Sequence, residues 1–213
     1  MIRKLDRNRA LTIAALAAIL LGLFGIHFLM DTEFDSASEL QRTAEQTAQT
    51  GSLLSQFKEL HLDVETSVRG YAITDNPAFL APYRRAVTRR KTLISALQRQ
   101  ADGIIVASLP QLEQLSDRQF ALAELNAVDV RAGRAERART RIAEGRGMRL
   151  MDALRAEVDS LAAIEERRLS ALGREGQNTS AAIERRLTIL LIGIALLLAF
   201  LTLAVSRSAR QRQ

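Results

Sequence analysis

The sequence predicts an all-α protein, an antiparallel four-helix bundle whose long first and last helices continue into two transmembrane helices. Three observations predict this fold class. Ala, Leu, Arg and Glu dominate the composition and only three prolines occur, a bias typical of helical bundles. Apolar residues recur at alternating spacings of three and four through the middle of the chain, which indicates helices with one buried face. Two apolar runs without charge flank this middle stretch, and no part resembles a strand at appreciable length.

The two apolar runs cover residues 10–30 and 187–205, and each is long enough for a helix that crosses a bilayer. The first run has 21 residues, or about 31 Å of helix at about 1.5 Å per residue. A cleaved signal peptide is the alternative for it, but such a segment has an apolar region of roughly 7–15 residues and ends at a small-residue cleavage site. This run is longer and passes through Met30 directly into Asp31, so we expect an uncleaved anchor.

The net charge of +6 resides in the two ends of the chain. Residues 1–9 and residues 206–213 each carry a charge of +3, whereas residues 31–186 contain 23 basic and 23 acidic side chains. A folded domain with no net charge removes the usual argument for nucleic acid as a partner, and basic tails favour cytoplasmic termini. We therefore expect a two-pass membrane protein, with both tails cytoplasmic and residues 31–186 extracytoplasmic.

Residues that carry chemistry are scarce. The chain has no Cys, which excludes a disulfide framework, a thiol nucleophile and a Cys-based metal site. Its two His lack the spacing of a zinc enzyme, and the sequence shows no nucleophile–base set and no Gly-rich phosphate loop. Single Ser, Glu and His residues on helical faces are expected to be solvated or to cap helices. We predict that the protein is not an enzyme, and we expect no cofactor and no metal.

Residues 31–74 are predicted to form the first helix of the bundle. They contain no proline, and one apolar seam follows a 4-3-4-3-4 spacing. Gly70 and then Thr74-Asp75-Asn76-Pro77 are predicted to close the helix, because Asn before Pro is a strong turn signal. The seam consists of Leu53, Phe57, Leu60, Val64, Ser67 and Tyr71.

The second and third helices are predicted to be about half as long as the first. A short turn at 77–81 leads into a helix from about 82 to 101, because Pro82 would interrupt a helix begun at Pro77. Ser108-Leu109-Pro110 is typical of an N-cap and the first turn of the third helix. The predicted buried side of the second helix is Tyr83, Val87, Ile94, Leu97 and Ala101, and that of the third is Leu109, Leu112, Phe120, Ala123, Ala127 and Val130.

Residues 131–149 are rich in Arg and contain three glycines, which predicts a loose or short-helical connection. A fourth long helix follows. Gly173 and Gly176 interrupt its continuation into the second apolar run, and each costs roughly 1 kcal/mol relative to Ala in a helix; they are either a hinge or simply tolerated. The apolar side of this helix is Met151, Leu154, Val158, Leu161 and Leu172.

Residues 63–83, DVETSVRGYAITDNPAFLAPY, carry the most informative pattern. An acidic pair two apart is followed by Arg-Gly-Tyr, a Thr turn, Asn-Pro and Phe-Leu. These positions are Asp63, Glu65, Arg69, Gly70, Tyr71, Thr74, Asn76, Pro77, Phe79 and Leu80. The pattern resembles the CHASE3 family of extracytoplasmic sensory domains in bacterial receptors, although Ser67 stands where family members often carry Gly. A second match, residues 147–155 followed by 165–169, resembles the last helix of the family. The resemblance covers most of residues 35–172, and it implies a four-helix sensory bundle between two spans without implying a ligand.

Members of that family usually continue after the second span into a signalling linker and an output domain, whereas eight residues follow the second apolar run here. We therefore expect a membrane-anchored sensory module that acts through a partner such as a histidine kinase or response regulator, with a homodimer as the default state. The alternative is a structural membrane protein that organises its neighbours without sensing.

Two candidate sites follow from the charges. Glu65 and Arg69 are four apart on one helix, so they form either a surface pair worth roughly 0.2–0.5 kcal/mol or a partly buried pair that fixes the turn and docks the second helix. The first and third connections of an up-down bundle lie at the same end, which gathers arginines at its tip. We predict there an anion site or an acidic partner surface, and a solvated charged surface is the alternative. Its residues are Arg84, Arg85, Arg89, Arg134, Arg137 and Arg141.

Overall fold

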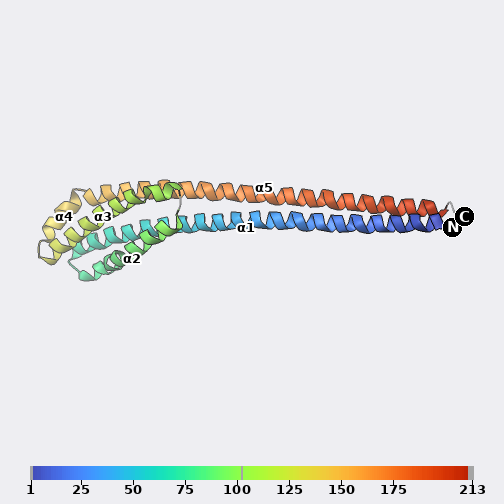
Figure 1. Ribbon diagram of the computed structural model, residues 1–213. Coiled ribbons are helices and arrows are strands. Elements are labelled where there is room, and N and C mark those ends of the chain that lie inside the picture. Colours follow the sequence, from blue (N-terminus) through green and yellow to red (C-terminus); the bar gives the residue numbers. More distant parts are fainter. Residues whose placement is uncertain (1, 102, 211–213) are drawn as a thin grey trace. The chain divides into compact units, whose positions relative to one another are not determined.

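The computed structural model describes the backbone of residues 2–101 and 103–210 and most of their side chains. Every element in this range is helical, so the predicted all-α fold class is confirmed (Figure 1). The elements are α1 (Ile2–Thr74), the 3₁₀ helix η1 (Pro77–Phe79), α2 (Leu80–Gln100), α3 (Gly103–Arg131), α4 (Ala135–Ala143) and α5 (Arg146–Arg210).

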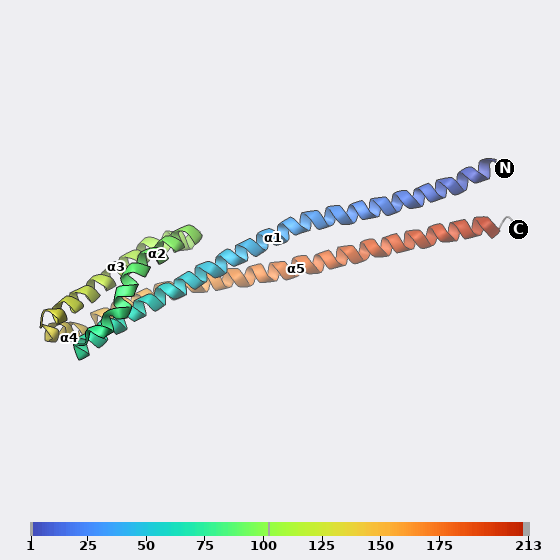
Figure 2. The ribbon, with the colours of Figure 1, turned by 90° about the horizontal axis from the view of Figure 1, so that it is seen from below.

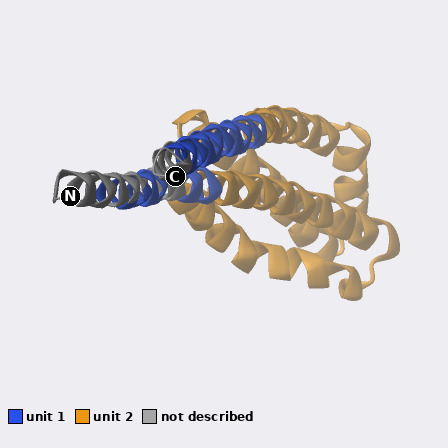
Figure 3. Cartoon of the chain, turned by 90° about the vertical axis from the view of Figure 1, so that its right-hand side faces the viewer, with its two compact units in different colours: residues 1–42, 172–213 blue, residues 43–171 orange. Residues whose placement is uncertain are grey.

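The chain divides into two compact units (Figure 3). Unit 1 comprises Met1–Arg42 and Leu172–Gln213, and unit 2 comprises Thr43–Ala171. Helices α1 and α5 belong to both units, and each is continuous along its length (Figure 2). The helix predicted over residues 31–74 is therefore the C-terminal part of a longer helix that ends at the predicted residue, Thr74.

Within unit 1 the segments of α1 and α5 approach each other closely at Gly22, where a Cβ atom would lie 2.8 Å from Cδ1 of Ile194. Many large apolar side chains of both segments are exposed, among them Leu20, Leu21, Phe24 and Phe28 of α1 and Ile189, Leu196, Phe200 and Leu203 of α5. Among the described residues, no helix contains a stretch of the length and apolar character needed to cross a membrane. The predicted spans at 10–30 and 187–205 and both predicted tails include side chains that lie outside the described set.

Unit 2 is a helical bundle in which α2 folds back along α1. Gln46 Nε2 donates to the backbone oxygen of Gln100 at 2.7 Å, and Arg89 Nη2 donates to Gln56 Oε1 at 2.7 Å. The first pair places the end of α2 beside the start of the part of α1 that belongs to unit 2, and the second joins the middle of α2 to α1 further along. Further side-chain bonds join α2 to α3 (Tyr83 to Glu124 and Gln98 to Glu113) and α1 to α5 (Lys58 to Asp159).

The core of unit 2 follows the predicted seam of α1. Phe57, Leu60, Val64, Ser67 and Tyr71 are buried, and Leu53 packs against them partly buried. Leu54, His61, Val68 and Ala72 are buried as well, so the buried face is wider than one seam.

The predicted start and buried side of α2 need correction. Helix α2 begins at Leu80, and Pro82 lies in its first turn, where a backbone N–H has no partner inside the helix to lose. Val87 is 46% exposed, contrary to the prediction, whereas Ala86 and Leu93 are buried. In the middle of the helix the buried residues, Ala86 and Leu93, each lie one position before the predicted ones, Val87 and Ile94. Tyr83 and Leu97 are buried as predicted, and Ile94 and Ala101 are partly buried.

The predicted N-cap of α3 at Ser108 is wrong. Helix α3 begins at Gly103 and contains Pro110 in its interior. Ile105, Leu109 and Leu112 are all buried at helical spacing, so packing holds the turn before Pro110 in the helix although proline cannot donate a backbone hydrogen bond. The predicted stripe of this helix, from Leu109 to Val130, is buried throughout.

The Arg-rich connection was predicted to be either loose or short-helical. It contains a short helix, α4, which confirms the second alternative. Gly133 and Gly145 lie at its two ends, each with a φ of 71°, a conformation that glycine adopts without steric cost. The predicted apolar side of the fourth helix, from Met151 to Leu161, is buried in α5, and Leu172 is half-buried where unit 1 begins. Helix α5 continues through Gly173 and Gly176, and a Cβ atom at either would meet nothing within 4 Å. A hinge at these glycines stays a prediction.

Candidate functional site

The end of α1 is fixed by residues of the motif at 63–83. The Thr74 hydroxyl donates to the backbone oxygen of Gly70 at 2.8 Å. Asp75 follows with a φ of 57°, and its backbone N–H donates to the oxygen of Tyr71 at 2.9 Å. Asp tolerates this left-handed conformation better than most residues, so α1 ends here with the carbonyl groups of Gly70 and Tyr71 bonded.

The next residues start η1 and return the chain toward α1. Asn76 Oδ1 accepts from the N–H of Ala78 at 3.0 Å, and Pro77 occupies the first helical position. The Phe79 ring then lies over Gly70, where a Cβ atom would come within 3.1 Å of the ring Cγ and closer still to two other ring atoms. The prediction that Gly70 closes the helix is therefore wrong. Its missing side chain leaves room for the Phe79 ring.

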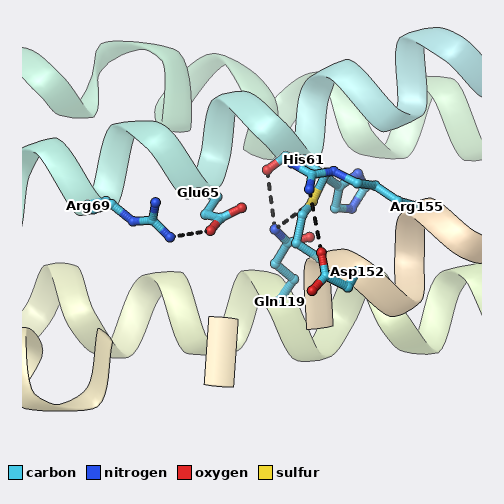
Figure 4. A network of polar contacts seen from close by, with 7 residues as sticks. His61, Glu65, Arg69, Gln119, Asp152 and Arg155 are labelled. Carbon is cyan, nitrogen blue, oxygen red and sulfur yellow. Dashed lines mark hydrogen bonds and ion pairs between the residues drawn. The ribbon is translucent and has the colours of Figure 1, made fainter. Parts of the chain in front are cut away.

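The acidic pair of the motif divides between two sides of α1. Asp63 is exposed and lines an open hollow of about 340 Å³ with Phe79 and Pro82. The Glu65 side chain is only 16% exposed and accepts from Arg69 Nη2 at 2.5 Å (Figure 4). This pair is partly buried, and it borders a pocket whose other walls come from α3, α4 and α5. No α2 residue lines this pocket, so the docking of the second helix that one of the two sequence-based alternatives required stays a prediction.

The tip of the bundle brings the third connection against the end of α1. Arg139 Nε donates to the backbone oxygen of Ala72 at 2.8 Å, so the first and third connections share one end, as predicted. Arg134 and Arg141 both pair with Asp129, at 2.9 and 2.7 Å. The hydrogen bonds from Arg141 and then Arg134 hold the pKa of Asp129 below its ordinary value.

The six arginines of the predicted anion site are thus not one cluster of equivalent groups. Arg134 and Arg141 are engaged by a buried carboxylate, and Arg89 donates to Gln56. Arg84, Arg85 and Arg137 are exposed, and within the described part of the chain their side chains make no hydrogen bond or ion pair. An anion site at the tip stays a prediction.

A buried polar network lies beside the Glu65–Arg69 pair and was not predicted. His61 is fully buried, with Nδ1 2.7 Å from the backbone oxygen of Phe57 and Nε2 2.7 Å from the Ser116 hydroxyl. A carbonyl oxygen only accepts, so Nδ1 carries the proton and Nε2 accepts from Ser116. Burial lowers the pKa of His61 to about 4, with the charge of Arg90 adding to that effect and the bond to Phe57 opposing it. The expectation of a solvated or capping His is wrong for this residue.

Gln119 extends the network toward α5. Its Nε2 donates to the backbone oxygen of His61 at 3.2 Å and contacts Met151 Sδ at 3.5 Å (Figure 4). Its Oε1 is enclosed and has no partner among the described residues. The guanidinium of Arg90 lies 4.9 Å from the centre of the Phe120 ring. Polar side chains of α1, α2 and α3 therefore meet inside an otherwise apolar core.

A regular spacing was the signal for these buried polar residues. On α3 the sequence Leu112, Ser116, Gln119, Ala123, Asn126, Val130 repeats the 4-3-4-3-4 pattern without a gap, and all six are buried. His61 likewise stands between Phe57 and Val64 on such a stripe. A search for apolar residues alone passes over these positions.

Comparison with protein families places this bundle. Residues 40–175 match the family model of the CHASE3 domain. No curated protein and no solved structure matches the chain. The matched range contains all of unit 2 and the complete motif at 63–83, which confirms the resemblance drawn from the sequence.

Proposed function

The chain belongs to the CHASE3 domain family, a family of extracytoplasmic sensory domains, and on this premise we propose that it is a membrane-anchored sensory module that passes a signal to a partner protein. The observation that carries the proposal is α5, one continuous helix from Arg146 to Arg210. Its first part supplies Met151, Leu154 and Val158 to the core of unit 2, and its later part contains the second apolar run. A small shift or rotation of this helix in the bundle can therefore travel along its backbone.

The proposed anchors are residues 10–30 and 187–205. The exposed apolar side chains on both segments of unit 1 support this placement, because apolar surface of that extent is a mark of a membrane or protein contact. The basic tails favour cytoplasmic termini. Residues 31–186 would then be extracytoplasmic in a bacterial inner membrane, and a homodimer is the simplest assembly.

The proposed partner is a histidine kinase or another signalling protein in the same membrane. Crosslinking in native membranes, with the C-terminal segment as bait, tests this directly. Recovery of a kinase or response regulator is expected. If the protein only organises its neighbours without sensing, the amount of each crosslinked neighbour should not change with any stimulus or variant.

The topology has its own test. Reporter fusions at Gln213, which lies outside the described residues, and near Asn126 in α3 should give opposite sidedness. An exported C-terminus would contradict the proposed arrangement and with it the sensory function.

The path of the signal is tested at the glycines of α5. Replacing Gly173 and Gly176 by Ala should stiffen the helix and change the output of the partner. Gly51→Ala in α1 is the matched control, because a Cβ atom there also meets nothing within 4 Å. An unchanged output in the double variant would show that this part of α5 carries no signal.

A further inference from the structure

Four helices of unit 2 leave a small pocket between them, bordered by Glu65 and Arg69 of α1, Gln119 and Asn126 of α3, Arg141 of α4 and Met148 of α5. We call it the Glu65 pocket. Its volume is about 40 Å³. Two small residues, Ala123 and Gly147, line the pocket and keep it open. A Cβ atom built at Gly147 would lie 3.7 Å from Leu122 Cδ2, in ordinary contact.

The Glu65–Arg69 pair presents unused hydrogen-bonding groups at this pocket. Only Glu65 Oε1 and Arg69 Nη2 take part in the bond between them (Figure 4). Within the described residues, Glu65 Oε2 has no donor and the remaining N–H groups of Arg69 have no acceptor. A carboxylate oxygen is thus offered beside guanidinium donors from the same helix.

Asn126 supplies a further donor in a fixed orientation. Its Oδ1 accepts from Arg141 Nη1 at 2.6 Å, and Arg141 Nη2 is held by Asp129 at 2.7 Å. Because the oxygen of the amide is engaged, its NH₂ group is the part left to bind another molecule. Asn126 is only 5% exposed, so this orientation is set by the packing of the bundle.

The pocket is bordered by charges of both signs. Glu65 pairs with Arg69, and Arg141 shares Asp129 with Arg134. A free cation is disfavoured by the nearby arginines, and a free anion leaves Glu65 Oε2 without a donor, whereas a molecule with both charges gains at each end. An ammonium group matches Glu65 Oε2, and a carboxylate matches the donors of Arg69 and Asn126.

We propose that the Glu65 pocket binds a small zwitterion, an amino acid with a short side chain such as glycine or alanine. The enclosed volume equals that of about three water molecules, so a ligand of this class fills it and reaches the mouth, where Arg69 is 49% exposed. Val68 and Met148 give apolar contact for a methyl group. The inference deepens the proposed sensory function and rests on it for the role of the ligand as a signal.

Binding is tested with the purified full chain in detergent micelles. The ceiling set by the number of heavy atoms is a Kd of about a few micromolar for glycine and about a few tenths of a micromolar for L-alanine. Calorimetry should give values no tighter than these, and saturation should raise Tm by several degrees. Acetate and methylammonium each carry one half of the zwitterion and should bind at least about tenfold more weakly. L-phenylalanine should not bind.

Two variants locate the site. Glu65→Gln keeps the shape of the side chain and should weaken glycine binding at least about tenfold. Asp63→Asn removes the same charge two residues away, outside the pocket, and should leave the Kd unchanged. Because Glu65→Gln also alters the ion pair, Ala123→Val provides a second test that fills the pocket and changes no charge.

Several results would overturn the proposal: no binding of glycine or alanine up to about 10 mM, far above the ceiling set by ligand size, equal binding by acetate, or unchanged binding by Ala123→Val. If glycine binding passes all these tests but leaves the output of the partner unchanged, the pocket is supported and the proposed function is contradicted instead. The two ideas therefore fail separately.

Discussion

His61 should make the stability of unit 2 depend on pH. Its pKa is about 4 in the folded chain and 6.5 in the unfolded chain. Between these values the unfolded chain binds a proton that the folded chain does not, so the free energy of unfolding falls as the pH decreases from 6.5 toward 4. Asp129 has a pKa lowered from 3.8, so its contribution is lost only below 3.8 and falls in a separate window.

The size of the effect follows from the two pKa values. Each pKa unit corresponds to about 1.4 kcal/mol. At pH 5 the unfolded His61 is almost fully protonated and the folded one is mostly neutral, which costs about 2 kcal/mol relative to pH 8. Unit 2 spans residues 43–171, and about 2.1 cal/mol/K per residue converts this loss into a decrease in Tm of about 7 °C.

The assay compares the chain with its His61→Gln variant. Gln can accept from Ser116 but does not titrate, so the variant should be less stable at pH 8 and should lose this part of the pH dependence. Thermal unfolding of the full chain in micelles, followed by circular dichroism from pH 8 to pH 5, measures both. If the two proteins lose the same number of degrees, His61 does not titrate as its burial requires.

Three further predictions concern stability in the same unfolding assay. Gly70→Ala should stabilise a Phe79→Ala variant by about 1 kcal/mol through helix propensity. It should not stabilise the unmodified chain, because the Phe79 ring fills the space of the new methyl group. An equal gain in both backgrounds would refute the contact. Asp129→Asn should lower Tm by several degrees and more than Asp117→Asn, because the Asp129 side chain is 7% exposed and that of Asp117 is 68% exposed. Arg69→Ala should also lower Tm by several degrees, since it leaves the mostly buried Glu65 without its partner; a change near zero would mean that the pair acts only at the surface.

Local features of the sequence were enough for the helices and for one turn. The spacing of apolar residues is read within a few turns of helix, so the buried faces of α1, α3 and α5 followed from it. Asn76-Pro77 marks a turn through its own backbone and side-chain chemistry, and α1 ends where that chemistry predicts. The shared end of the first and third connections followed from chain direction alone.

The position of Pro110 shows where local rules stop. Its missing N–H predicts a helix start at Ser108, but burial of Ile105 one turn earlier extends α3 through the proline. Burying a large aliphatic side chain contributes about 1.5–3 kcal/mol, which competes with the cost of a proline in a helix, about 3 kcal/mol. Only the packed bundle determines which effect is larger.

The pocket and the pairing of partners in the polar network depended on tertiary structure. The partner of His61 is Ser116, 55 residues away, and the Glu65 pocket needs side chains from four helices. The sequence by itself determined that the chain is helical, where α1 ends and which faces of α1, α3 and α5 are apolar, because those properties arise between neighbours in the chain. It did not determine which arginines meet Asp129, nor which hydroxyl binds the buried histidine, because charges and hydrogen bonds act between groups that only the packing of the helices brings together.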